Sequence, residues 1–314
     1  MTAKLYKKSR KSRSIRKRTY RGRFAPSPTG PLHYGSLVTA LASYLQARTR
    51  NGEWFVRIED IDPPREIKGA AGLILQTLSD LGFKWDSQPI FQHRRIPYHR
   101  YTAQRLVENG LAYYCECSRK DIATQSNHGP MGLIYPGLCA SKHLAKQENC
   151  TTRIRVNESP ITYTDKIFGL QTCNLKDESG DFVIYRADDL PSYILAASLD
   201  DLYESYTEIV RGHDLLAITP RQLFLSSIMQ RECASFMHIP VIVNDSGEKL
   251  SKQTHAPEIK KHQARDLLID TLTDLGQDPP RSLRWRPLWV TWAWAMHYWD
   301  PDLIPRIRSI RFRG

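Results

Sequence analysis

Apolar residues recur along the first part of this chain at spacings that predict a strand, a helix and a second strand. Residues 36–48 carry apolar side chains at helical spacing, and residues 53–59 form an apolar run of the kind found in buried strands. Residues 23–25 predict a short strand that enters a turn rich in proline and glycine at 26–31. A strand, a helix and a strand within about 40 residues are typical of the βαβ unit of a parallel sheet.

The middle of the chain has a different pattern. Residues 115–139 carry three of the six cysteines, are rich in Gly, Pro, Ser and Asn, and predict a loop. Short alternating runs at 152–156 and 182–186 predict antiparallel strands of an inserted subdomain. Further elements are expected as helices at 68–81, 96–109, 258–275 and 288–299, as helical or βα segments at 193–197, 209–216 and 220–229, and as a strand at 239–243. The pattern predicts an α/β protein with an inserted α+β subdomain.

Positive charge is concentrated at the two ends of the chain. The net charge is +12, residues 1–23 hold eleven Lys or Arg and no acid, and residues 281–314 hold seven Arg against two Asp. Basic ends suit a polyanion such as RNA, because phosphate contacts give affinity independent of base sequence. For residues 1–20 a disordered, solubilising extension is an equally good interpretation. No run reaches the about 18 apolar residues of a membrane span and no secretory signal is visible, so we expect a cytoplasmic protein with no membrane partner.

Two segments have the composition of phosphate-binding loops. In the first, the proline-rich turn leads to a helix N-terminus, whose unpaired backbone N–H groups bind anions. Gly35 has no Cβ and lets a flat ring approach the backbone, while His33 can donate hydrogen bonds to phosphate oxygens. In the second, residues 244–253 follow a predicted strand, and Lys249 and Lys252 can clamp a polyphosphate. The alternative interpretation is a turn and an exposed lysine loop without a ligand.

Residues 33–36, His-Tyr-Gly-Ser, resemble the HIGH motif of class I aminoacyl-tRNA synthetases in its glutamyl- and glutaminyl-type form. Residues 249–253, Lys-Leu-Ser-Lys-Gln, resemble the KMSKS loop of the same enzymes. Ser36 replaces the second His of the first motif, and Gln253 replaces the final Ser of the second. The resemblance implies a Rossmann-like class I core that binds ATP with Mg²⁺. It also implies that the substrate carboxylate attacks the α-phosphate while His33 and Lys252 stabilise the developing charge.

Glutamate carries two carboxylates and an amine, so its site needs guanidinium groups and an acid. Arg23, Arg57 with Glu59, and Arg211 lie at the ends of predicted strands, where parallel sheets bind ligands. The resemblance to glutamyl-tRNA synthetases implies that Glu59 takes the α-amino group. It also implies that the rest of the glutamate site is formed by Arg23, Ala25, Ser27, Tyr193 and Arg211. For Tyr193 a core aromatic is an almost equally good interpretation.

The clustered cysteines predict a metal site, since a reducing cytosol disfavours disulfides. Cys115 and Cys117 are one residue apart, and Cys139 lies downstream in the same loop. Three thiolates can enclose Zn²⁺ once a fourth ligand is supplied, and chemistry alone favours a histidine. The candidates for the fourth ligand are Tyr135, His128, His143 and Cys150. The resemblance implies one structural zinc on Cys115, Cys117, Tyr135 and Cys139, with His128 as the rival to Tyr135; three reduced core cysteines are the alternative.

Only 61 residues follow Gln253, too few for the anticodon-binding domain that glutamyl-tRNA synthetases carry. The resemblance therefore narrows to their truncated relatives, the glutamyl-Q tRNA(Asp) synthetases. It implies activation of glutamate without tRNA, then esterification of the queuosine base at the wobble position of tRNA(Asp), whose anticodon stem-loop would bind the zinc-bearing insert. The alternatives are a minimal glutamyl-tRNA synthetase that charges the 3′ end of tRNA(Glu), and a non-catalytic RNA-binding relative.

We expect a monomer with five segments. These are a basic extension (1–21), the first half of the nucleotide-binding domain (22–114), the zinc-bearing insert (115–190), the second half with the lysine loop (191–255), and a helical C-terminal region with a basic tail (256–314).

Overall fold

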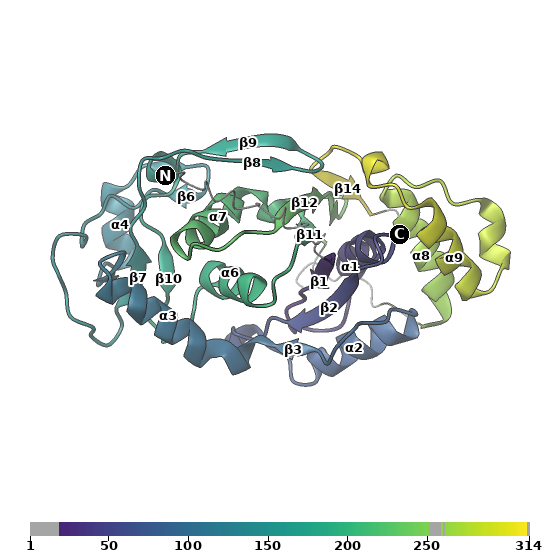
Figure 1. Ribbon diagram of the computed structural model, residues 1–314, viewed down its shortest axis with the longest axis horizontal. Coiled ribbons are helices and arrows are strands. Elements are labelled where there is room, and N and C mark those ends of the chain that lie inside the picture. Colours follow the sequence, from purple (N-terminus) through teal and green to yellow (C-terminus); the bar gives the residue numbers. More distant parts are fainter. Residues whose placement is uncertain (1–18, 251–258, 260, 313–314) are drawn as a thin grey trace, which may run out of the picture.

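The computed structural model describes residues 19–250, 259 and 261–312 (Figure 1). A central region of parallel strands lies between a lobe built largely from residues 96–185 and a pair of helices from residues 264–298 (Figure 1). None of the helices in these ranges is long and apolar enough to cross a membrane.

The first half of the central region contains the predicted strand, helix and strand. Its elements are β1 (Arg21–Phe24), α1 (Tyr34–Arg48), β2 (Glu53–Ile58), α2 (Ala70–Asp80) and β3 (Ile90–Phe91). β2 pairs in parallel with both β1 and β3. The core side of α1 is fully buried against these strands, as at Leu37, Leu41 and Leu45. The predicted parallel α/β arrangement is confirmed here.

The second half of the central region adds two more parallel strands. Its elements are α6 (Tyr193–Tyr203), β11 (Glu208–Gly212), α7 (Thr219–Ile228), β12 (Ser235–Ile239) and β13 (Val241–Val243). β11 pairs in parallel with β12 and lies beside β1, where the Thr207 N–H donates to the Arg21 carbonyl at 2.9 Å. The strand predicted at 239–243 is confirmed in part. Val241–Val243 form β13 and Ile239 ends β12, and Pro240, which has no N–H to donate, separates the two.

The segment between the two halves forms the lobe. Its elements are α3 (Ile96–Glu108), β4 (Ala112–Cys115), α4 (Arg119–Gln125), β5 (His128–Gly129), β6 (Gly132–Leu133), β7 (Thr151–Ile154), β8 (Ile161–Asp165), β9 (Gly169–Cys173), α5 (Leu175–Glu178) and β10 (Val183–Tyr185). The predicted antiparallel strands are confirmed as β7 and β10, which pair with each other, and β7 also pairs with β4. Residues 115–139 are not all loop, because Ser118 and Asp121 form a capping box that starts α4.

The C-terminal region packs back onto the central strands. Its elements are α8 (Ala264–Asp274), α9 (Leu288–Tyr298) and β14 (Ser309–Arg311), which pairs in parallel with β13. The predicted helix at 258–275 begins, as α8, at Ala264. Short 3₁₀ helices occupy Pro63–Arg65, Gln92–Arg95, His213–Ile218, Lys261–Gln263, Arg281–Trp285 and Pro301–Leu303.

An aromatic cluster fixes α9 against the first strands. The Tyr44 ring lies 5.0 Å from that of Trp54 and 5.2 Å from those of Phe83 and Trp292, centre to centre. The Trp292 indole N–H also donates to the Leu81 carbonyl at 3.0 Å. These contacts join α9 to α1, so the C-terminal helices belong to the same hydrophobic core as the first strands.

Candidate active site and metal centre

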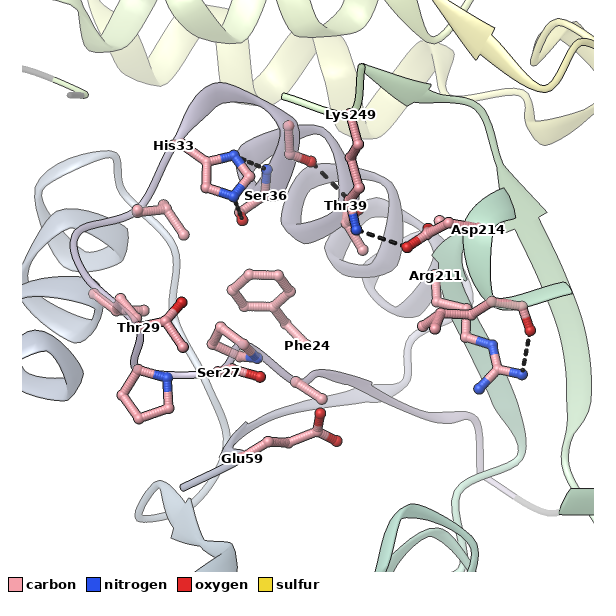
Figure 2. A pocket seen from close by; sticks show the side chains of 18 of the residues that line it. Phe24, Ser27, Thr29, His33, Ser36, Thr39, Glu59, Arg211, Asp214 and Lys249 are labelled. Atoms are coloured by element: carbon pink, nitrogen blue, oxygen red, sulfur yellow. Dashed lines mark hydrogen bonds and ion pairs between the residues drawn. The ribbon is translucent and has the colours of Figure 1, made fainter. Parts of the chain in front are cut away.

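A cavity of about 700 Å³ opens where the turn after β1, the start of α1 and the ends of β2 and β11 meet (Figure 2). Ligands of parallel sheets bind at such strand ends. The predicted residues that line this cavity are Arg23, Ala25, Ser27, His33, Gly35, Glu59, Tyr193, Arg211 and Lys249. Residues up to 226 positions apart in the sequence, Arg23 and Lys249, are thus brought to one place.

His33 caps the N-terminus of α1. Its Nδ1 accepts the Ser36 N–H at 3.3 Å, and its Nε2 lies 2.9 Å from the Ser36 hydroxyl (Figure 2). A Cβ on Gly35 would lie 3.3 Å from the His33 ring and 3.5 Å from the Leu250 carbonyl. A side chain at position 35 would therefore crowd the His33 imidazole as well as the cavity. Packing against His33 thus favours glycine here, in addition to the predicted approach of a flat ring.

Arg23 is held by an acid that the sequence did not identify. Its Nε and Nη2 lie 3.1 and 3.4 Å from the two carboxylate oxygens of Asp201, and its Nη1 donates to the Val210 carbonyl at 3.5 Å. Asp201 also accepts from Arg57 at 2.6 Å, so one carboxylate bridges two buried guanidinium groups. Burial alone would raise the pKa of Asp201, but Arg23 and Arg57 outweigh burial and lower it.

Glu59 reaches the cavity beside this network. Its carboxylate accepts from Arg57 at 2.9 Å, and only 7% of the residue is exposed. Burial raises the pKa of Glu59 despite Arg57. A second positive group, such as an ammonium, would offset that desolvation by stabilising the charged form.

Arg211 lies on the β11 side of the cavity with no carboxylate bonded to it among the described residues. Its Nε donates to His238 Nε2 at 2.9 Å, and its Nη2 donates to the Thr219 hydroxyl at 2.7 Å and the Leu215 carbonyl at 3.3 Å. Nη1 is buried and has no hydrogen-bond partner among the residues that the structure describes. Burial lowers the pKa of Arg211, as expected of a cation held away from water.

Tyr193 begins α6 and also lines the cavity, where burial raises its pKa to about 12. Its hydroxyl is therefore a neutral hydrogen-bonding group at physiological pH.

The second predicted phosphate-binding segment is only partly described. Lys249 lines the cavity and donates to the Asp214 carboxylate at 2.6 Å (Figure 2). Lys252, to which we assign catalysis and ATP binding, lies outside the described residues together with Gln253. Its role stays a prediction.

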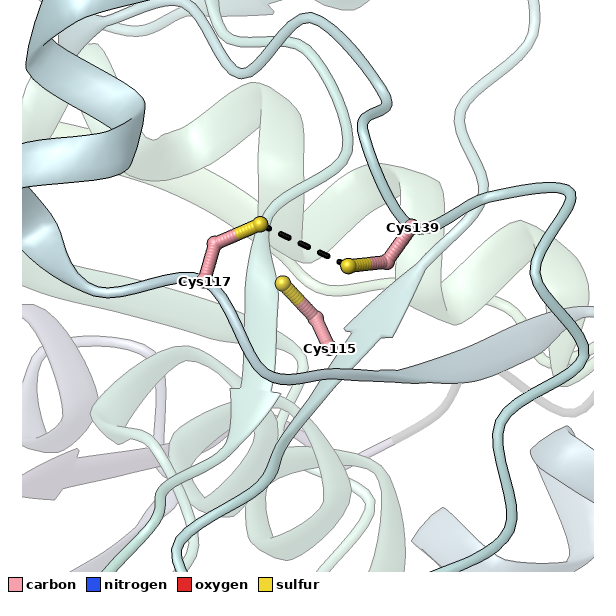
Figure 3. A group of neighbouring side chains, drawn as sticks. All are labelled: Cys115, Cys117 and Cys139. Carbon is pink, nitrogen blue, oxygen red and sulfur yellow. Dashed lines mark hydrogen bonds between the residues drawn. The ribbon is translucent and has the colours of Figure 1, made fainter.

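The three predicted cysteines converge in the lobe, with their sulfur atoms turned toward one another (Figure 3). These atoms all lie within 4.8 Å of one another, and Cys117 and Cys139 are 3.4 Å apart. The Tyr135 hydroxyl lies 3.2 Å from Cys115 Sγ and 3.6 Å from Cys117 Sγ. His128, the rival fourth ligand, is an exposed residue of β5.

This donor set fits a small thiophilic cation. Burial alone would raise the pKa of Cys115, but hydrogen bonds from Tyr135 and Arg153 lower it to about 7. Arg153 donates to Cys115 Sγ at 3.3 Å and lies over the Tyr135 ring. A thiolate is the form of cysteine that binds metal, so the surroundings of Cys115 favour a ligand state. Burial raises the pKa of Cys117 to about 11 and also raises the pKa of Tyr135, so these two groups would lose their protons only to a bound cation.

The chain matches a known family over most of its described length. Residues 19–273 match the family model for the catalytic domain of class I tRNA synthetases (E and Q). The chain is 44% identical over 289 residues to the glutamyl-Q tRNA(Asp) synthetase of Dechloromonas aromatica, covering 91% of this chain and 96% of that protein. It is 45% identical over 292 residues to the glutamyl-Q tRNA(Asp) synthetase of Pseudomonas fluorescens, covering 93% and 96%.

The fold has a counterpart among solved structures. The glutamate-tRNA synthetase of Elizabethkingia anophelis superposes with a TM-score of 0.75 at 21% identity, over 95% of this chain and 68% of that one. The class I synthetase fold predicted from the two motifs is thereby confirmed. The chain is an ATP-dependent ligase by descent and belongs to the class I tRNA synthetases of the glutamyl and glutaminyl type, within the glutamyl-Q tRNA(Asp) synthetases.

Proposed function

We propose that this chain activates glutamate with ATP in the absence of tRNA and then transfers it to the queuosine base at the wobble position of tRNA(Asp). The observation that carries the first step is the cavity itself. There a buried acid, Glu59, and a buried guanidinium, Arg211, which has no acid partner within the described residues, lie near the start of α1. The names of the relatives, which match along nearly their whole length, support the second step.

Activation needs positioning more than it needs a protein nucleophile. An oxygen of the glutamate α-carboxylate attacks the α-phosphorus of ATP, the bond to the β-phosphate oxygen breaks, and pyrophosphate leaves with those electrons. Glu59 binds the α-ammonium, and Arg211 and Tyr193 bind the side-chain carboxylate. The N–H groups at the start of α1, His33 and the lysine loop stabilise the phosphates, and ATP brings its own Mg²⁺.

Transfer then needs an acceptor hydroxyl close to the adenylate. Its oxygen attacks the acyl carbon, the acyl–phosphate bond breaks, AMP leaves with the bonding electrons, and the hydroxyl proton passes to the leaving phosphate or to water. We propose that the anticodon stem-loop lies against the lobe, and that the protein acts as a monomer. One zinc on Cys115, Cys117, Tyr135 and Cys139 would hold the lobe segment that contains α4. Its role would be structural, because four protein ligands leave no open position on Zn²⁺ for a substrate.

Two assays test these steps in order. Glutamate-dependent exchange of pyrophosphate into ATP, without tRNA, tests activation, and its absence in zinc-loaded protein would favour a non-catalytic RNA-binding relative. Transfer of labelled glutamate to tRNA(Asp) with and without queuosine tests the acceptor. We expect transfer only with queuosine. Full activity on unmodified tRNA(Glu) would instead identify a minimal glutamyl-tRNA synthetase.

A further inference from the structure

Two buried arginines line the cavity, and their partners differ in charge. Arg23 is bonded directly to the carboxylate of Asp201. Arg211 is bonded to an imidazole, a hydroxyl and a carbonyl, all of them without a negative charge. A direct carboxylate cancels much of a guanidinium's charge, whereas a neutral acceptor fixes its orientation and leaves the charge available to a ligand.

The hydrogen bonds determine which nitrogen of His238 carries the proton. The Nε–H of Arg211 can only donate, so His238 Nε2 at 2.9 Å must accept. The ring proton therefore lies on Nδ1, which donates to Asp165 at 2.7 Å. Both partners of that bond are inaccessible, since the side chains of His238 and Asp165 are each 0% exposed. The result is a chain of hydrogen bonds in which Arg211 donates to His238 and His238 donates to Asp165.

Asp165 is itself fixed by the backbone. It accepts the N–H groups of Ile167 and Phe168 at 3.0 Å each, and that of His238 at 3.1 Å. It lies at the end of β8, where Phe236 of β12 is its partner across the sheet, while His238 and Arg211 are direct neighbours on β12 and β11. Three adjacent strands thus supply one residue each, and the outermost belongs to the hairpin β8–β9 of the segment between the two halves of the central region (Figure 1).

We propose that His238 and Asp165 are positioning residues that hold the Arg211 guanidinium in place for the side-chain carboxylate of glutamate. This inference rests on the proposed function and adds two residues that touch no substrate. His238 supplies an acceptor without charge, and Asp165 fixes the ring and its tautomer. Nη2 is occupied by Thr219 and Leu215, which leaves Nη1 of Arg211 as the group for the ligand (Figure 2).

The first test compares kinetic constants for pyrophosphate exchange. His238→Phe keeps a flat ring of similar size and removes the acceptor, so the KM for glutamate should rise about tenfold to a hundredfold, the effect of a lost hydrogen bond to a charged group. The KM for ATP should stay within about twofold, because ATP does not use Arg211. His238→Gln offers an amide oxygen as acceptor and should restore part of the loss.

The matched control is a second buried His–Asp pair. His99 Nε2 lies 2.9 Å from Asp200, both side chains are 0% exposed, and neither residue lines the cavity. His99→Phe should cost folding stability but leave the KM for glutamate near that of the wild type. An unchanged KM in His238→Phe, an equal rise for ATP, or an equal rise in His99→Phe would overturn the proposal.

A second measurement does not depend on activity or on a variant. Nitrogen NMR of histidine-labelled wild-type protein should show His238 as a neutral ring with its proton on Nδ1. A proton on Nε2 would overturn the proposed chain of hydrogen bonds from Arg211 to Asp165, even if the protein activates glutamate. Absence of glutamate-dependent exchange in the wild type, together with the expected tautomer, would instead refute the proposed function without contradicting this chain of hydrogen bonds.

Discussion

Replacing Glu59 with glutamine tests how the amino group of glutamate is recognised. Among the described residues, the carboxylate of Glu59 accepts a hydrogen bond from Arg57 at 2.9 Å, and it reaches the cavity from the end of β2. Glutamine keeps the shape and an oxygen for Arg57 but removes the negative charge. Arg57 retains its second acid, Asp201 at 2.6 Å, so it is not left buried without a counter-charge.

The expected sizes of the two effects follow from these contacts. Folding stability should change by no more than about 1 kcal/mol, because a neutral hydrogen bond to Arg57 remains and the loss of a charge that burial disfavours offsets the weaker bond. Binding loses a hydrogen bond between two charged groups, about 1.5 to 3 kcal/mol, which corresponds to an increase of about tenfold to a hundredfold in the KM for glutamate. The perturbation should therefore appear mainly in substrate binding.

Pyrophosphate exchange at varied glutamate measures the KM, and thermal unfolding measures the stability. Glu53→Gln is the matched control, since Glu53 starts the same strand, forms an ion pair with Arg21 and lies outside the cavity. Glutarate, which has both carboxylates and no amine, should inhibit Glu59→Gln as well as it inhibits the wild type. A wild-type KM for glutamate in Glu59→Gln, at unchanged stability, would refute the assignment of the ammonium to this acid.

Three further predictions concern the metal, the backbone and pH. Cys117→Ser should lower bound zinc, measured by atomic absorption, from about one equivalent per chain to a small fraction, and retained zinc would contradict the ligand set. Gly276→Ala should cost more than about 1 kcal/mol in urea unfolding, since its φ is +76° and a Cβ would lie 2.1 Å from the Leu303 carbonyl, whereas Gly110→Ala, with φ +71° and open space, should cost less. Burial lowers the pKa of His238 to about 4, so between about pH 6.5 and 4 the unfolded chain binds a proton that the folded chain does not. The free energy of unfolding should therefore fall by up to about 3 kcal/mol as the pH is lowered through this range. In His238→Phe the melting temperature should depend less on pH over this range, and an equally steep fall would exclude the histidine as its cause.

The sequence predicted the elements whose periodicity is strong and the residues whose position in a motif is fixed. α1 and β2 were found within two residues of their ends, because apolar spacing directly reports the buried face of a helix or strand. Arg23, Glu59 and Arg211 were predicted to lie close together, because the ends of parallel strands share one edge of a sheet, and all three line the same cavity.

The residues that the sequence missed are acids and bases inside apolar elements. Asp201 lies next to Asp200 in α6, and spacing alone assigns two adjacent acids to the solvent-facing side of a helix. The side chain of Asp201 is nevertheless only 12% exposed, and it bridges two arginines. The one available signal was a pair of acids in an otherwise apolar helix. His238 gave no signal, since its partner Asp165 is 73 residues away in the sequence and only the pairing of β8 with β12 brings them together.

The join between β1 and β11 also has a consequence for the order in which the chain folds. The Arg21 N–H donates to the Thr207 hydroxyl across a separation of 186 residues, and the lobe lies between them in sequence. At about 5 to 20 residues per second, a ribosome needs roughly 10 to 40 s to make that segment. During this time the edge of β1 that later lies beside β11 is unpaired, and the core of the lobe still lacks Leu195, Leu199, Phe224 and Leu225. We therefore expect newly made N-terminal fragments to be bound by chaperones until β11 emerges, and slow synthesis of the lobe to lower the yield of soluble protein.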